Sequence, residues 1–143
     1  MCAVSEIVKE FFVVQEKSGN TLDLALIDSQ YSDTFMFGDP SGSRVIEKQK
    51  FLAVLPRRQE FFKSLGHKYT HVVSLEENKL DDHYVVVEAH FQMHFEPPSR
   101  QSVDAMLNST YILFIKEGAA RIVMQIEHHD LQVAMRELGL LTS

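Results

Sequence analysis

The sequence predicts one α+β domain, in which a cone-shaped, curved antiparallel sheet wraps around N-terminal helices and leaves an apolar pocket. Three observations support this class. The chain has 143 residues, which is typical of a single domain spanning residues 1–143. Apolar residues recur at helical spacing up to about residue 65, and with a period of two after Gly66. Helices followed by a run of strands are typical of α+β folds.

Two helices and a strand are predicted in the first part of the chain. In VSEIVKEFFVV the apolar residues fall on one helical face, and Gly19 and Asn20 are expected to end this helix. TLDLALID follows as a shorter helix with Thr21 as its N-cap. DTFMF is then predicted as a strand that ends at a turn over residues 38–42, because four of these five residues are strong turn formers.

The longest helical pattern runs from Val45 to Leu65. Its buried stripe consists of Phe51, Leu52, Leu55, Phe62 and Leu65. Pro56 lies inside this pattern and is expected to kink or divide the helix, because proline lacks a backbone donor and clashes with the preceding turn. Gly66 is the expected C-terminal stop.

Four antiparallel strands and a final helix are predicted after Gly66. The strands are HKYTHVVSLEE at 67–77, HYVVVEAHFQMHFE at 83–96, STYILFI at 109–115 and ARIVMQIEHH at 120–129. The turn KEGA joins the last two strands, and Asp130 begins the helix. The alternation assigns Tyr69 and His71 to the mainly apolar face of the first strand. In the second strand, the face with Phe91, Met93 and Phe95 is expected to meet the helices.

The histidines do not have the spacing of a metal site. His90 and His94 are four residues apart on a strand, which separates them by about 13 Å. Two ligands of one zinc ion must each lie about 2 Å from the metal. This spacing therefore argues against a metal site, and no metal and no cofactor are expected. These histidines share a polar face with Glu88 and Gln92, which is expected to meet solvent or another subunit.

Composition narrows the classes of partner. The formal net charge is −6 and there is no basic run, which argues against nucleic-acid binding. Cys2 is the single cysteine, so the chain cannot form an internal disulfide. No stretch resembles a signal peptide or reaches the length of a membrane span. We therefore expect a cytoplasmic protein that does not bind membranes.

The order of the elements, the length, and YSDTFMFGDPSGS before a long helix resemble the nuclear transport factor two-like superfamily, especially its SnoaL-like branch. EGAARIVMQIEHHD resembles the final G-K-I strand of that branch, which also ends in an acidic residue. The resemblance covers nearly the whole chain and implies the cone-shaped fold. Because the superfamily includes isomerases, cyclases, dehydratases, epoxide hydrolases and non-catalytic association modules, it does not select one activity.

A shorter motif implies a catalytic base. GDPSG resembles the D-P-x-G of ketosteroid isomerases, whose aspartate shuttles a proton, and Asp39 takes the place of that aspartate. In an apolar cavity such a carboxylate would have a raised pKa. Phe12 stands where those enzymes carry a tyrosine donor, and Tyr111 lies near their second acid, where it would donate to an oxyanion. The alternative is that Asp39 is an ordinary turn residue.

Other candidates follow from the strand faces. His71 and His128 fall on mainly apolar faces, where a neutral imidazole can transfer protons. Contacts to a ligand are expected from Phe37, Tyr69, Phe91, Met93, Phe95 and Met124. Glu88, Glu96 and Glu127 lie on polar faces and are assigned no chemistry.

Two functions remain as alternatives. The first is a cofactor-independent isomerase, lyase or hydrolase that acts on a small, mostly apolar molecule by general acid–base chemistry. The second is a non-catalytic binding or association module whose cavity is filled with side chains. A homodimer through the sheets is expected, because Ile112 and Phe114 place apolar surface on the face opposite Tyr111, Leu113 and Ile115. A cavity of a few hundred Å³ with converging polar groups would favour the first function.

Overall fold

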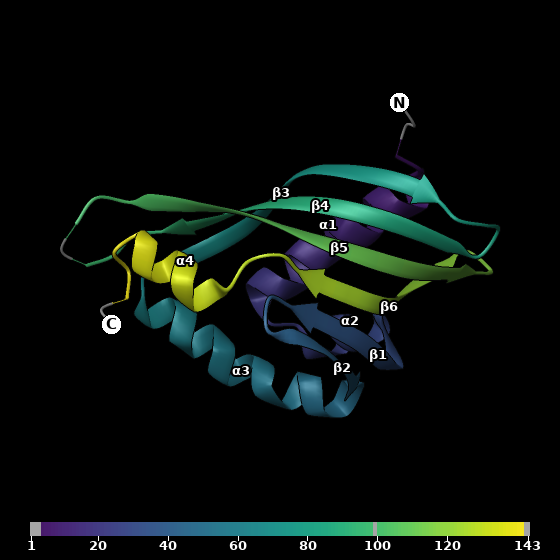
Figure 1. Ribbon diagram of the computed structural model, residues 1–143, viewed down its shortest axis with the longest axis horizontal. Coiled ribbons are helices and arrows are strands. Elements are labelled where there is room, and N and C mark those ends of the chain that lie inside the picture. The colour runs from purple at the N-terminus through teal and green to yellow at the C-terminus, as the bar shows by residue number, and fades with distance from the viewer. Residues whose placement is uncertain (1–3, 99, 142–143) are drawn as a thin grey trace.

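The structure is a computed structural model that describes residues 4–98 and 100–141, and it consists of a curved sheet with helices on its concave side (Figure 1). The helices are α1 (Glu6–Thr21), α2 (Leu24–Ser29), α3 (Lys48–Ser64) and α4 (Leu131–Glu137). The strands are β1 (Tyr31–Asp39), β2 (Gly42–Glu47), β3 (His67–Lys79), β4 (Tyr84–Phe95), β5 (Val103–Lys116) and β6 (Ala119–Glu127). This confirms the predicted α+β class.

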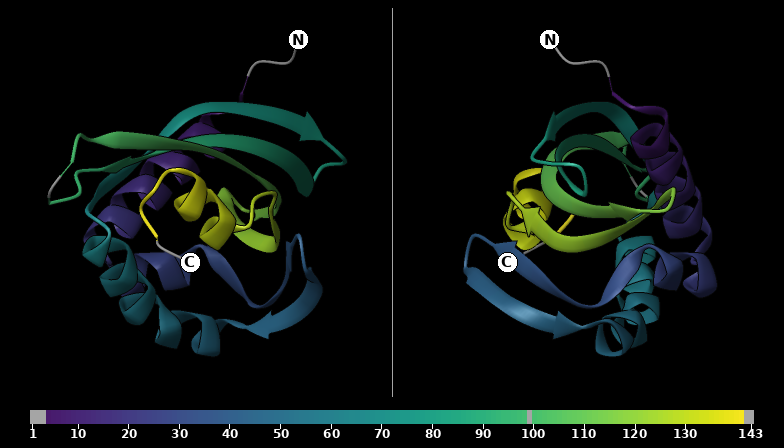
Figure 2. Two further views of the ribbon diagram at one scale, coloured as in Figure 1. Left: turned by 60° about the vertical axis from the view of Figure 1, so that its left-hand side comes forward. Right: turned by 90° about the vertical axis from the view of Figure 1, so that its right-hand side faces the viewer.

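The six strands form one open sheet in the order β2-β1-β6-β5-β4-β3. Neighbours from β6 to β3 are antiparallel, as predicted, whereas β1 pairs with β6 in parallel. The sheet is therefore mixed rather than purely antiparallel. It curls into a cone, and α1, α2 and α3 cover its open side (Figure 2).

The first two helices differ from the prediction at their boundary. α1 continues through Gly19 and Asn20 to Thr21, whose hydroxyl donates back to the Lys17 carbonyl at 2.8 Å. Thr21 therefore belongs to α1 and does not cap α2. The N-cap of α2 is Asp23, whose carboxylate accepts a hydrogen bond from the backbone N–H of Leu26 at 3.2 Å.

The region before α3 is a strand and not the first turns of a helix. The turn at residues 38–42 reverses the chain, so that Val45 and Ile46 pair with Met36 and Phe35 of β1. These β-branched residues therefore extend the sheet, and α3 begins only at Lys48. α3 is a single helix that includes Pro56, so the proline does not divide it.

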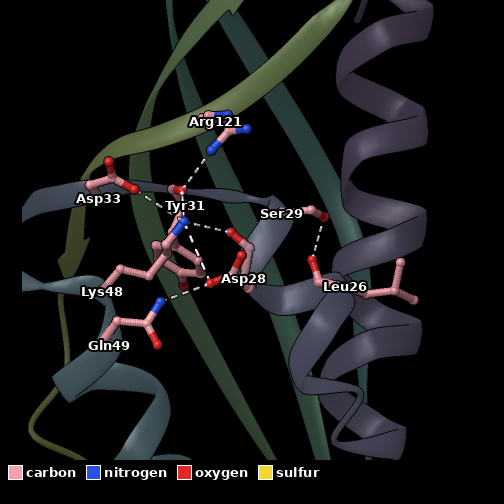
Figure 3. Close-up of polar contacts among 8 residues, drawn as sticks. All are labelled: Leu26, Asp28, Ser29, Tyr31, Asp33, Lys48, Gln49 and Arg121. Atoms are coloured by element: carbon pink, nitrogen blue, oxygen red, sulfur yellow. Dashed lines mark hydrogen bonds and ion pairs between the residues drawn. The ribbon is translucent and has the colours of Figure 1, made fainter.

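Lys48 fixes the junction of α2, β1 and α3 (Figure 3). Its ammonium group is buried and donates to the backbone carbonyls of Asp28 at 3.2 Å and Tyr31 at 3.3 Å. The carboxylates of Asp28 and Asp33 each lie 3.5 Å from the same nitrogen. This lysine therefore holds the start of β1, and with it the backbone of Tyr31, against α3.

Irregular pairing in β3 and β6 changes which side chains face the helices. In β3 the register shifts between Val72 and Ser74, and Val73 bulges out with 48% of its surface exposed. In β6 the register shifts at Val123: the consecutive β5 residues Ile112 and Leu113 pair with Met124 and Ile122, so Val123 is the extra residue. An extra residue reverses the alternation of a strand from that point on.

The buried apolar residues form two clusters. The larger one lies between α1, α3 and the sheet, and its centre includes Val8, Phe12, Val87, Leu113 and Ile122. In the smaller cluster, Met135 of α4 packs with Phe62 of α3 and Phe95 of β4. α4 therefore covers one end of the cone (Figure 1). At this end β5 is longer than predicted: it begins at Val103 and pairs with β4 along its length.

Candidate functional site

A cavity of about 270 Å³ lies between the concave face of the sheet and α1, α2 and α3. Its walls are mostly apolar and aromatic. They include Phe51, Leu55 and Phe62 of α3, Val72 of β3, Phe91 and Met93 of β4, and Leu107 of β5. A concave, largely apolar space with a few polar groups is the usual form of a small-molecule site.

The polar groups of the cavity gather in one corner, where hydrogen bonds from Ser109 and Gln125 end on Glu127. Ser109 donates its proton to one carboxylate oxygen of Glu127. Tyr111 lies two residues after Ser109 on the same face of β5, and its hydroxyl accepts a hydrogen bond from Gln15 at 3.0 Å.

A chain of two hydrogen bonds reaches the other oxygen of the same carboxylate. The Tyr31 hydroxyl donates to the amide oxygen of Gln125 at 2.6 Å, and the amide nitrogen of Gln125 donates to Glu127 at 2.7 Å. Gln125 and Tyr111 are directly paired across β6 and β5, as are Glu127 and Ser109. The register of these two strands therefore assembles the corner.

Both tyrosines of the corner hold their protons firmly. Burial raises the pKa of Tyr31 and of Tyr111 well above the usual value, and the negative charge of Glu127 raises each pKa further. Tyr111 is 2% exposed and Tyr31 6% exposed. Both tyrosines therefore keep their hydroxyl protons at neutral pH and can donate hydrogen bonds.

Comparisons with known proteins locate this architecture among solved structures. No model of a known protein family matches the chain, and no curated protein matches its sequence. An NTF-2-like protein of unknown function from Shewanella oneidensis matches with a TM-score of 0.68 and 15% identity, over 87% of this chain and 98% of that chain. The chain has the NTF2-like fold.

Two further solved structures match over most of their length. Aln2 from a Streptomyces species has a TM-score of 0.73 at 13% identity, over 94% of this chain and 99% of that chain. The β subunit of benzoate 1,2-dioxygenase from Burkholderia mallei has a TM-score of 0.70 at 12% identity, over 93% and 95%. The NTF2-like fold expected from the sequence is thus confirmed, and the fold alone does not select an activity.

Within this NTF2-like fold, three of the predicted site residues line the cavity. They are Phe91, Met93 and Tyr111. Phe95 is fully buried in the smaller apolar cluster, and Phe37 lines a second hollow beside the cavity. These two residues lie on the inner side of the sheet but outside the cavity wall.

The other predicted contacts are on the convex face of the sheet. Tyr69 is 44% exposed and stacks on His94 with 5.0 Å between the ring centroids. Met124 pairs with Ile112 and Met36 on the same convex face. The bulges in β3 and β6 explain both corrections, because they reverse the alternation on which the prediction relied.

His71 and His128 do not meet inside the cone. His71 is exposed and lies 2.9 Å from Glu16 of α1, while His128 is exposed and lies 2.6 Å from the hydroxyl of Thr110. Neither lines the cavity. His71 is on β3 and His128 directly follows β6, so β4 and β5 separate them in the sheet.

Asp39 lies in the turn that joins β1 to β2. Its carboxylate accepts hydrogen bonds from the backbone N–H of Ser41 at 2.9 Å and from the Ser41 hydroxyl at 2.5 Å. These bonds lower the pKa of Asp39, whereas a general base near neutrality needs a raised pKa. Asp39 lines the second hollow, which adjoins the cavity at Arg58 and Glu127.

The polar corner was missed because its residues are separated in sequence and their faces were misassigned. The prediction placed Glu127 on a polar face and gave it no role, whereas the bulge after Ile122 turns Gln125 and Glu127 inward. A signal was present: a strand that carries two polar residues at positions i and i+2 on its inner face needs buried partners for them.

No metal centre is found in residues 4–98 and 100–141, where no three His, Cys, Asp or Glu side chains lie close enough to share an ion. None of the helices described is long and apolar enough to cross a membrane.

Proposed function

We propose that the protein binds a small, mostly apolar molecule in the cavity and holds an oxygen atom of that molecule against Tyr111 and Glu127. One observation carries this proposal: hydrogen bonds from Ser109 and Gln125 converge on the carboxylate of Glu127, which lines a largely apolar cavity beside Tyr111. A ligand oxygen would be drawn to this corner because the other walls offer it few partners.

The corner also suits proton transfer. A carboxylate can take a proton from carbon or oxygen as a general base. Tyr111 keeps its proton at neutral pH and can donate to the oxygen on which negative charge develops. A base and a donor on one substrate are the requirements of isomerase-, cyclase- and dehydratase-type reactions without a cofactor. In this proposal Glu127 takes the role that the sequence suggested for Asp39, His71 or His128.

Hydrogen–deuterium exchange tests the proposal without knowledge of the substrate. Cyclic ketones such as 2-tetralone exchange their α-protons with D₂O when a base removes them, and NMR follows the loss of signal. We expect the protein to accelerate this exchange, and Glu127→Gln to lower the acceleration about a hundredfold or more. His128→Gln is the matched control, because His128 lies on the convex face and should leave the rate unchanged.

The outcomes separate the two function classes. Exchange that survives Glu127→Gln would contradict the role of the carboxylate. Ketones that raise the melting temperature, with no accelerated exchange, would leave a binding domain without catalysis. If the ketones produce no thermal shift and no accelerated exchange, the proposed cavity function as a whole is contradicted.

Exposed apolar residues on the convex face favour a second role, as one subunit of a homodimer. Val45 of β2 is 68% exposed and Met106 of β5 is 58% exposed. Ile112 and Phe114 of β5 and Met124 of β6 are partly exposed on the same face. Exposed apolar side chains on one face of a sheet favour a contact with another protein surface. The matching β subunit of a dioxygenase supports the idea that this fold can be one part of an assembly.

Light scattering tests the homodimer. We expect a mass of twice 16.4 kDa at micromolar concentration, and a shift toward the monomer for Met106→Glu, which places a charge in the contact. A mass near 16.4 kDa for the unaltered protein would contradict this role.

A further inference from the structure

The net charge of the cavity lining is opposite in sign to the net charge of the whole chain. The chain has 20 acidic and 14 basic residues, yet the cavity is lined by three cations and two carboxylates. The cations are Arg58, Lys63 and Lys68, and the carboxylates are Glu16 and Glu127. The lining therefore carries one net positive charge inside an acidic protein, which favours a ligand with one negative charge.

Lys63 and Lys68 belong to the rim of the cavity and are free to bind. Both side chains are exposed, and neither forms an ion pair with any of the described residues. Glu16, the carboxylate at this part of the wall, is already engaged by the backbone N–H of Val72 at 2.6 Å and by His71 at 2.9 Å. The two ammonium groups therefore have no competing partner in the described part of the chain.

A tight turn fixes the two lysines relative to each other. The N–H of Gly66 donates to the Lys63 carbonyl at 2.9 Å, and the Gly66 carbonyl accepts from Glu96 at 2.7 Å. Gly66 has a φ of +95°, and a Cβ atom there would lie 2.7 Å from the backbone of Glu96. The connection between α3 and β3 is thus held against the end of β4.

The lysine end of the cavity is well separated from the Glu127 corner. Lys68 is on β3 and Glu127 is on β6, with β4 and β5 between them. Three strand spacings of about 4.8 Å put roughly 14 Å of sheet between the two strands. An anion beside the lysines therefore avoids the charge of Glu127, and the wall between them is apolar and aromatic.

We propose that the ligand is an amphipathic carboxylate, whose apolar body lies against Phe62 and Phe91 and whose carboxylate is bound by Lys63 and Lys68 at the rim. This inference rests on the proposed function, because it specifies the chemical class of the molecule that the cavity takes. The carboxylate supplies the single negative charge that the lining favours, and its apolar body keeps the reactive oxygen at the Glu127 corner.

The test compares three probes that differ only in their head group: 4-phenylbutanoate, 4-phenylbutan-1-ol and 4-phenylbutan-1-amine. Their dissociation constants are measured by NMR titration at low salt, and competition between the probes shows whether they share one site. We expect the carboxylate to bind most tightly and the amine most weakly. We also expect the preference for the carboxylate to shrink as salt screens the lysines.

Charge removal locates the head group. The double variant Lys63→Gln/Lys68→Gln should weaken 4-phenylbutanoate about threefold to tenfold and leave the alcohol unchanged, since exposed charge pairs contribute modestly. Lys50→Gln is the control, because Lys50 is 80% exposed and lies outside the cavity. Equal binding of carboxylate and alcohol at one site would overturn this inference and leave the cavity function standing. If no probe binds, both proposals fail.

Discussion

The concave and convex faces of the same strands use polar residues in different ways. On the concave face the polar groups are few, buried and joined to one another, and they converge on Glu127. On the convex face they are many and exposed. There His94 contacts Asp104 at 2.7 Å and Glu96 at 3.0 Å, and Thr110 lies between Glu88 and His128. Chemistry is therefore expected where polar groups are buried in a cavity, and not where titratable residues are most numerous.

A matched pair of valines tests the difference between the faces most strongly. Val87 is fully buried on the concave face of β4, and Val73 is 48% exposed on β3. Val87→Ala should lower the free energy of unfolding by about 2–3 kcal/mol, from lost apolar burial and the cavity that remains. Val73→Ala should change it by less than about 0.5 kcal/mol. Urea unfolding measures both, and equal losses would contradict the assignment of the faces.

Much of the fold could be predicted from the sequence, because the spacing of apolar residues changes from helical to a period of two at Gly66. Glycine, proline and other turn-forming residues also mark the ends of several elements. The hairpin of β1 and β2 was not predicted, since Val45 and Ile46 fit a helical stripe as well as a strand. The prediction exchanged the convex and concave faces in parts of β3 and β6, because a β-bulge has no local sequence signal. Val73, the extra residue of β3, is an ordinary residue type for a regular strand. Tyr111, Phe91 and Met93 were placed in the cavity because β4 and β5 pair regularly over these residues.

Lys48 supports the concave side from outside the cavity. Lys48→Met keeps the length of the side chain but removes the donor shared by the carbonyls of Asp28 and Tyr31. We expect a loss of about 1–3 kcal/mol in the free energy of unfolding, which is the cost of buried acceptors left without a donor. Lys50→Met is the exposed control on the same helix. An unchanged unfolding midpoint for Lys48→Met would show that the junction does not depend on this lysine.

Two histidines should make stability depend on pH in opposite directions. Burial lowers the pKa of His67 below 6.5, so its contribution to stability is present above pH 6.5 and is lost as the pH falls. The hydrogen bond to Asp104 raises the pKa of His94 above 6.5, so its contribution is present below pH 6.5 and is lost as the pH rises.

Unfolding measured from about pH 5 to about pH 8 separates these two effects. Relative to the unaltered protein, His67→Gln should remove part of the loss of stability at acidic pH. His94→Gln should instead remove part of the loss as the pH rises. Slopes that change in the same direction in both variants would contradict the environments assigned to the two rings.

Asp39 should give the smallest effect. Asp39→Asn retains a side-chain oxygen that can accept the backbone N–H of Ser41, so the turn keeps its main hydrogen bond. We expect unchanged melting and unchanged ketone exchange at neutral pH. A large loss of exchange with folding intact would return the catalytic role to Asp39 and remove the need for Glu127.

Methionine methyl NMR tests the central claim most directly, because the chain carries a reporter on each face. Met93 lines the cavity, and Met106 is 58% exposed on the convex face. In protein labelled with ¹³C-methyl methionine, saturating 4-phenylbutanoate should shift the Met93 resonance and leave that of Met106 in place. A shift of Met106 without a shift of Met93 would contradict the claim that the concave cavity is the binding site.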